Sequence, residues 1–272
     1  MARKKTGDST ASLEGASTGG RDPLLVQSVE KAFRVLQAFD GTRKSLSLSQ
    51  LVETTGLDMS AAQRFTHTLA KLGYLQKDEE TRRFELTVKA LDFGYHYTRS
   101  SSLVERALPY LMHISKTVEE TVNLTVLDGT EIVFISRFMS RHVLNNDVII
   151  GTRLPAYCTA PGIAILSRLA PERAAAVLDR SDLRPFTPMT TWDRTELLAK
   201  ISRSAEQGYA TAFEEYFHGD LSLAAAIVDQ HGCPIGAINI AVSSSRYTAE
   251  QAQVKFAHLV VAAALSISQP RR

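Results

Sequence analysis

The chain has 272 residues, a length that predicts two domains because domains cluster at roughly 100 to 150 residues. Hydrophobic residues make up 44% of the chain and charged residues 22%, a balance that excludes an intrinsically disordered protein. The formal net charge of +2 is too small to indicate nucleic-acid binding by itself, although the positive excess lies in the first 99 residues. The longest apolar run, residues 259–265, is too short to span a bilayer, and no secretory signal follows Met1. We therefore expect a cytoplasmic protein without membrane contact.

The cysteines predict neither a disulfide framework nor a metal site. Only Cys158 and Cys233 are present, far apart in the chain and outside any CxxC motif. We therefore expect two reduced thiols, no metal and no cofactor.

The N-terminal part of the chain predicts three helices after a tail. Residues 1–22 lack apolar periodicity and predict a flexible tail. Residues 25–39 carry apolar side chains at spacings of three and four, which predicts an amphipathic helix. Ser47 or Ser49 can cap a short second helix that Gly56 ends, and a third helix follows over residues 58–72.

A charged hairpin follows these helices. Two short strands, at residues 74–75 and 83–86, flank the polar turn at residues 77–81. Helix, turn, helix and hairpin in this order predict a winged helix-turn-helix DNA-binding domain at residues 23–86. Thr87 can cap one more helix, which predicts a linker helix at residues 87–100.

The third helix has the pattern of a recognition helix. Its apolar positions Ala62, Phe65, Leu69 and Leu72 are predicted to face the core. The opposite face presents side chains suited to base edges and phosphates, namely Ser60, Gln63, Arg64, His67 and Lys71. Basic residues of the hairpin and of an earlier loop are predicted to contact the DNA backbone, namely Arg82, Arg83, Arg43 and Lys44. The alternative is that this face is only the solvated side of an amphipathic helix, but the order of elements favours DNA binding.

Beyond residue 100 the pattern changes to alternating strands and helices. A helix at residues 103–118 precedes two strands around the turn Asp128-Gly129. Further strands are predicted at residues 143–150, 209–214, 221–228 and 235–242, and helices at residues 161–169, 172–178, 193–207 and 249–267. Thr248 and Gln251 form a capping box for the last helix. The whole chain is thus predicted to be α+β, with an antiparallel sheet and flanking helices at residues 101–268.

Short stretches in both predicted domains carry a family resemblance. They are residues 59–65, 72–75, 84–86, 120–124, 151–159, 208–210, 214–215 and 223–225. Together they resemble the IclR family of transcriptional regulators, and most closely its members that regulate aromatic-acid catabolism. The resemblance covers about residues 24–265. It implies a homodimer or homotetramer, an operator with repeated half-sites, and a GAF-like domain that binds a small organic acid.

A position for the acid can be argued from the residues as well. Thr159 can cap a helix that contains Pro161, and free amides at a helix start favour carboxylates. Arg153 and Arg137 are candidates to neutralise a carboxylate, although single arginines are more often surface ion pairs. The resemblance places in the ligand site Thr159, Ala160, Gly162, Ser222 and Asn239. The alternative for these residues is ordinary helix capping and strand packing.

Four positions depart from the family pattern. Ser222 stands where many members have Cys, Asn239 and Ala241 stand where Ser is common, and Ala212 replaces a frequent Asp. These changes make the predicted pocket less polar than in members that bind very small keto acids. The departures therefore favour a larger or aromatic acid.

Two other functions remain open at this stage. One is an enzyme with Cys158 as nucleophile, a base at His142 or His231, and acids at Glu214 and Glu215. No GxSxG, HExxH, GxxxxGK[ST] or GxGxxG motif supports it, so we expect no enzymatic activity. The other is a DNA-binding assembly protein whose second domain binds no ligand.

Overall fold

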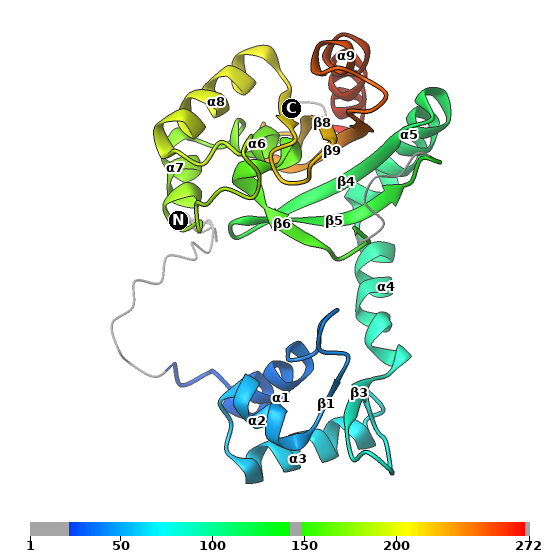
Figure 1. The fold of residues 1–272 in the computed structure, drawn as a ribbon, viewed down its shortest axis with the longest axis vertical. Coiled ribbons are helices and arrows are strands. Elements are labelled where there is room, and N and C mark those ends of the chain that lie inside the picture. The colour runs from blue at the N-terminus through cyan, green and yellow to red at the C-terminus, as the bar shows by residue number, and fades with distance from the viewer. Residues whose placement is uncertain (1–21, 142–147, 270–272) are drawn as a thin grey trace, which may run out of the picture. The chain divides into compact units, whose positions relative to one another are not determined.

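The computed structural model describes residues 22–141 and 148–269 (Figure 1). It divides the chain into two compact units, one up to Asp92 and the other from Phe93 onward. The division falls inside the segment 87–100 that the sequence predicts as a linker. The predicted tail, residues 1–22, lies outside the described residues except for its last position.

Three helices form the N-terminal unit: α1 (Gln27–Gln37), α2 (Leu48–Thr55) and α3 (Met59–Lys71). Ser47 begins α2 with a reciprocal capping box to Gln50, and Gly56 ends it with φ of +66°, a conformation that favours glycine. Asp58 caps α3 by accepting a hydrogen bond from the backbone of Ala61. The helix-turn-helix is therefore fixed by local capping on both sides of the turn.

The hairpin after α3 belongs to a three-stranded antiparallel sheet. Its strands β2 (Leu75–Lys77) and β3 (Phe84–Leu86) are joined by β1 (Ser45–Leu46), in the order β1-β3-β2. The two-residue strand β1 was not predicted, since so short a strand has no periodicity of its own. A short 3₁₀ helix, η1 (Val88–Ala90), follows and begins at Thr87 as the sequence predicts.

The structure corrects the predicted core face of α3. Leu72 was expected to be buried but is 54% exposed, because it lies beyond the last helical turn. Thr66 occupies the buried face instead, and its hydroxyl donates to the carbonyl of Ala62. Ala62 and Leu69 are buried as expected.

The C-terminal unit is built on one six-stranded antiparallel sheet with the order β6-β5-β4-β9-β8-β7. The strands are β4 (Thr121–Asp128), β5 (Glu131–Phe138), β6 (Arg153–Pro155), β7 (Ala210–Phe213), β8 (Asp220–Val228) and β9 (Pro234–Ser243). Most of the predicted strand at residues 143–150 lies outside the described residues. Residues 148–150, which the structure describes, do not form a strand.

Helices cover both faces of this sheet (Figure 1). The helices α5 (Ser102–Val118) and α9 (Ala249–Ile267) pack on one face, where Leu111 and Phe256 join the core. On the other face lie α6 (Ala160–Leu166), α7 (Pro171–Asp179) and α8 (Arg194–Gln207), which share a second core. The short helix η2 (Ala156–Cys158) leads into α6, and α4 (Leu91–Ser100) precedes α5. None of the helices within these described ranges is long and apolar enough to cross a membrane.

The two faces of the sheet differ in chemistry because strand side chains alternate. On β4 and β9, large aliphatic residues such as Leu124 and Ile240 face α5 and α9. Their neighbours Asn123, Asn239 and Ala241 face α6 and are polar or small. This difference leaves space between the sheet and α6.

Candidate functional site

The outer face of α3 carries the side chains predicted to contact DNA. Its five candidate residues are all exposed: Ser60, Gln63, Arg64, His67 and Lys71. Their spacings of three and four place them on one side of the helix. The hydrogen-bonding side chains of α3 therefore lie together on its exposed face, while Ala62 and Leu69 are buried on the opposite face.

The basic residues outside α3 fall into two groups. Lys44 and Arg82 are exposed, and Arg82 pairs with Glu79 in the hairpin turn. Arg43 and Arg83 make contacts within the unit that the sequence did not predict, and their contacts with DNA phosphates stay a prediction. Arg43 forms an ion pair with Asp40.

Arg83, directly before β3, joins the hairpin to β1 and to the first turn of α2. Its guanidinium donates to the hydroxyl of Ser45 at 2.8 Å, to the carbonyl of Ser45 at 2.6 Å, and to Oε1 of Gln50 at 2.8 Å. Three hydrogen bonds across 33 to 38 residues of sequence hold the hairpin against the helices. The main role of Arg83 in this geometry is therefore to position the hairpin.

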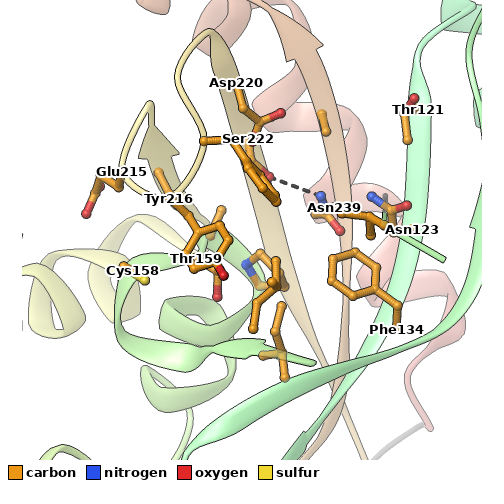
Figure 2. Close-up of a pocket in the computed structure, with 18 of the residues that line it drawn as sticks. Thr121, Asn123, Phe134, Cys158, Thr159, Glu215, Tyr216, Asp220, Ser222 and Asn239 are labelled. Carbon is orange, nitrogen blue, oxygen red and sulfur yellow. Dashed lines mark hydrogen bonds between the residues drawn. The ribbon is translucent and has the colours of Figure 1, made fainter. Parts of the chain in front are cut away.

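A cavity lies between the sheet and the start of α6 (Figure 2). Its free space for the centre of a water-sized molecule is about 70 Å³, several times the roughly 10–15 Å³ that one water needs. The predicted residues Thr159, Ala160, Ser222 and Asn239 all line it. A small organic molecule is therefore the natural occupant.

One wall of the cavity is aromatic. Phe134 on β5 forms one side, and Tyr216 and Phe217 come from the loop between β7 and β8. The rings of Tyr216 and Phe217 meet edge to face with centroids 4.6 Å apart, which fixes their positions. Ile132 and Leu154 extend the apolar surface.

The floor of the cavity is polar and is made by the sheet. Arg137, Asn123 and Asn239 are neighbours across β5, β4 and β9 in the strand register. Arg137 donates to Oδ1 of Asn123 at 3.1 Å, and Nδ2 of Asn239 donates to the hydroxyl of Ser222 at 3.0 Å. A ring between the two surfaces can therefore present polar groups to the sheet and carbon atoms to the aromatic wall.

Charged groups also reach the cavity. Burial lowers the pKa of Arg137 and raises the pKa of Asp220 to about 7, while each opposes the shift of the other through its charge. Glu215 is buried and forms an ion pair with Lys200. Arg137 is therefore the cation that lines the cavity among the described residues.

Three sequence predictions for this region need correction. Arg153 does not line the cavity, because its guanidinium binds Asp128 and Glu131 on the surface. Thr159 precedes α6 but does not cap it, since its hydroxyl donates back to the carbonyl of Pro155 at 3.0 Å. Gly162 is buried behind the lining, where close packing requires it.

The comparisons with known proteins agree with this arrangement in both units. The model of the IclR helix-turn-helix domain matches residues 28–79, and the model of the bacterial transcriptional regulator IclR C-terminal domain matches residues 95–269. The chain belongs to the IclR family of bacterial transcriptional regulators. The resemblance seen in the sequence is therefore confirmed, as is the α+β fold.

Individual IclR relatives match over nearly the whole chain. The Pca regulon regulatory protein of Pseudomonas putida is 32% identical over 243 residues, which are 89% of this chain and 83% of that protein. A transcriptional regulator from Rhodococcus sp. RHA1 has a crystal structure with 32% identity and a TM-score of 0.79, covering 89% of this chain and 97% of that one. An IclR homolog from Microbacterium hydrocarbonoxydans, crystallised with 4-hydroxybenzoate, has the same fold at 22% identity and a TM-score of 0.74, covering 89% and 97%.

The geometry disfavours the catalytic alternative for this IclR protein. Burial, and then the charge of Glu215, raise the pKa of the Cys158 thiol to about 12, whereas a nucleophilic cysteine needs a lowered pKa. His231 is exposed in the turn between β8 and β9, beside Gln230, and His142 lies outside the described residues. Glu214 accepts a hydrogen bond from the backbone of Gly219, and Glu215 pairs with Lys200. Within the described ranges, no group of three or more His, Cys, Asp or Glu side chains is placed to hold a metal ion.

Several lining residues of the IclR cavity were missed from the sequence. Thr121 and Asn123 are buried polar residues that alternate with the aliphatic Val122 and Leu124 on β4. The sequence did contain a signal for these two lining residues. In a strand that is buried on both faces, a polar residue at every second position indicates a polar site on one face. The aromatic wall carried no such signal, since Tyr216 and Phe217 lie in a loop.

Proposed function

We propose that this IclR regulator binds operator DNA through α3 and the hairpin, and that a small aromatic carboxylate in the cavity changes this binding. The observation that carries the ligand class is the cavity itself. Its aromatic wall at Phe134 and Tyr216 suits the faces of a ring, while Arg137 supplies a cation for a carboxylate. This pairing of surfaces fits an aromatic acid better than a small keto acid.

The relatives support the same ligand class. One is a regulator of the Pca regulon, and the Microbacterium hydrocarbonoxydans homolog was crystallised with 4-hydroxybenzoate. Apolar substitutions at Ala212 and Ala241, both in the lining, leave room for a ring beside the sheet. These observations come from different sources and favour the same kind of molecule.

For the DNA-binding half we assign roles by position. Gln63 and Arg64 are the base-reading candidates, because their long side chains can form paired hydrogen bonds with adenine and guanine edges. Ser60, His67 and Lys71 flank them on the exposed face and complete the contact surface, while Lys44 and Arg82 are placed for phosphate contacts. Arg43 and Arg83 act by holding the loop and the hairpin.

The assembly is proposed to be at least a homodimer. The helix α4 buries none of its residues, and its large side chains Leu91, Phe93, Tyr95 and Tyr97 are each at least half exposed. Exposed apolar surface on this scale marks an interaction site, and a second copy of the chain fits an operator with repeated half-sites.

The test is a titration of the full chain onto its own upstream DNA, followed by fluorescence anisotropy with scrambled competitor DNA present. We expect sequence-specific binding that at least one aromatic carboxylate changes about fivefold or more, equivalent to a coupling of roughly 1 kcal/mol. Specific binding that no aromatic acid changes would remove the proposed ligand class. A panel of small keto acids is the matched control, for which we expect no change.

A further inference from the structure

A buried hydrogen-bond acceptor faces the cavity without a partner. Asn239 on β9 is 3% exposed, and its amide nitrogen donates to the hydroxyl of Ser222 at 3.0 Å. Its amide oxygen, Oδ1, is also buried but finds no hydrogen-bond partner among residues 22–141 and 148–269. Figure 2 shows the amide nitrogen directed at Ser222 and the oxygen on the side of Phe134.

Such an atom is rare in a folded protein. Most buried polar atoms have a hydrogen-bond partner, because losing water without replacement costs free energy. The carbonyl oxygen of an amide can only accept hydrogen bonds, so its missing partner must be a donor. A polar atom that has no partner among the described side chains but lies in a ligand cavity is suited to bind a donor on the ligand.

The surroundings of Oδ1 narrow the kind of donor. Phe134, Ala212 and Ala241 line the cavity with carbon atoms only. Asn123, which is opposite Asn239 in the strand register, accepts a hydrogen bond from Arg137. The nearest lining cation in the register is Arg137, which lies two strands away and donates to Asn123. A carboxylate has no proton to donate and belongs beside Arg137, so the group at Asn239 is a different part of the ligand.

We infer that the effector carries a hydroxyl group that donates a hydrogen bond to Oδ1 of Asn239. The cavity then selects hydroxylated aromatic acids over the same acids without the hydroxyl group. This inference rests on the proposed function and deepens it by naming one residue that determines specificity. The selectivity arises because an unsubstituted ring leaves the buried oxygen unpaired in the complex.

The test is isothermal titration calorimetry of the full chain with matched ligands. The probes are benzoate, its three monohydroxy isomers, and the corresponding fluorobenzoates, in which fluorine replaces the hydroxyl group but has no proton to donate. We expect one hydroxybenzoate to bind about tenfold or more tightly than benzoate, and its fluoro analogue to bind within about twofold of benzoate.

Two variants assign this preference to Asn239. Asn239→Leu keeps the number of side-chain heavy atoms but removes the acceptor, and it should reduce the ratio of the hydroxybenzoate and benzoate affinities to within about twofold. Thr125→Val is the matched control, because Thr125 is buried with an unpaired hydroxyl but does not line the cavity. This control should keep the full preference.

The wild-type protein alone can overturn the inference. Equal affinities for benzoate and every hydroxybenzoate would remove it while leaving the proposed function in place. A fluorobenzoate that binds as tightly as its hydroxy analogue would also remove it, since donation by the ligand would then be unnecessary. Absence of binding by every aromatic acid would contradict the proposed function and the inference together.

Discussion

Asp220 at the start of β8 and Arg137 on β5 line the same cavity, and their opposite charges act on each other there. Burial nevertheless prevails over this attraction and raises the pKa of Asp220 from 3.8 to about 7. The carboxyl group therefore keeps its proton in the folded protein at pH values where the unfolded chain has lost it. This difference links the stability of the fold to pH.

The first prediction follows from the raised pKa of Asp220 in the folded protein. Protonated Asp220 contributes stability that is complete below about pH 4 and is lost as the pH rises through about 7. Asp220→Asn removes this titration, so between these pH values the wild type should lose up to about 1.4 kcal/mol per pH unit relative to the variant. Urea unfolding across this pH range measures the difference. Asp182→Asn, at an exposed carboxylate, should keep the wild-type slope, and an unchanged slope in Asp220→Asn would refute the assignment.

The second prediction concerns the recognition helix. Arg64→Ala should weaken binding to the specific operator by about 1–3 kcal/mol and binding to random DNA much less, because a base contact carries sequence information. Competition anisotropy with both DNAs measures the ratio. Arg173→Ala on α7 removes the same charge from an exposed position in the other unit and should leave the ratio unchanged. Equal losses on both DNAs would place Arg64 on a phosphate instead.

The third prediction separates two adjacent arginines. Arg83→Ala should destabilise the N-terminal unit by roughly 1–3 kcal/mol, because it leaves Ser45 and Gln50 without their hydrogen-bond donor. Arg82→Ala removes only an exposed ion pair with Glu79 and should cost less than about 1 kcal/mol. Hydrogen exchange at the amides of β1 and α2 measures both effects. Similar exchange rates in the two variants would contradict the positioning role of Arg83.

The sequence predicted features that depend on neighbouring residues, and it failed for features that depend on contacts between distant residues. Ser47, one of the two capping candidates, and Thr248 with Gln251 begin their helices where the sequence places them, since a cap acts within one helical turn. Arg153 was misjudged because its partners Asp128 and Glu131 lie on two other strands, β4 and β5. The composition of the cavity likewise depends on the register of strands that are far apart in sequence.

A bulge in β5 explains why the alternation of side chains along this strand did not predict which residues line the cavity. Phe134 and Arg137 are three residues apart, so strict alternation would place them on opposite faces of the sheet. A register shift opposite Leu124 and Thr125 lets both side chains line the cavity. Nothing in the sequence of β5 marks this irregularity. The aromatic wall and the cation therefore came together only in three dimensions.

The fourth prediction tests the packing beneath the cavity. A Cβ atom on Gly162 would lie 2.1 Å from the carbonyl oxygen of Ala156, so Gly162→Ala must displace α6 from η2. We expect a loss of about 1–3 kcal/mol or more in stability, together with loss of ligand binding. Gly94→Ala is the matched control, because its Cβ atom meets nothing within 4 Å and alanine favours helix α4. A thermal melt with and without ligand distinguishes the two variants.

The fifth prediction compares the two thiols. Cys158 is fully buried with a pKa of about 12, whereas Cys233 is exposed in the turn between β8 and β9. A thiol reagent at neutral pH should therefore modify one cysteine of the native protein quickly and the second only after unfolding. Mass spectrometry of the modified peptides identifies each site, and Cys233→Ser should abolish the fast reaction. Rapid modification of Cys158 in that variant would instead reveal an activated thiol in the cavity, and the catalytic alternative would then have to be reopened.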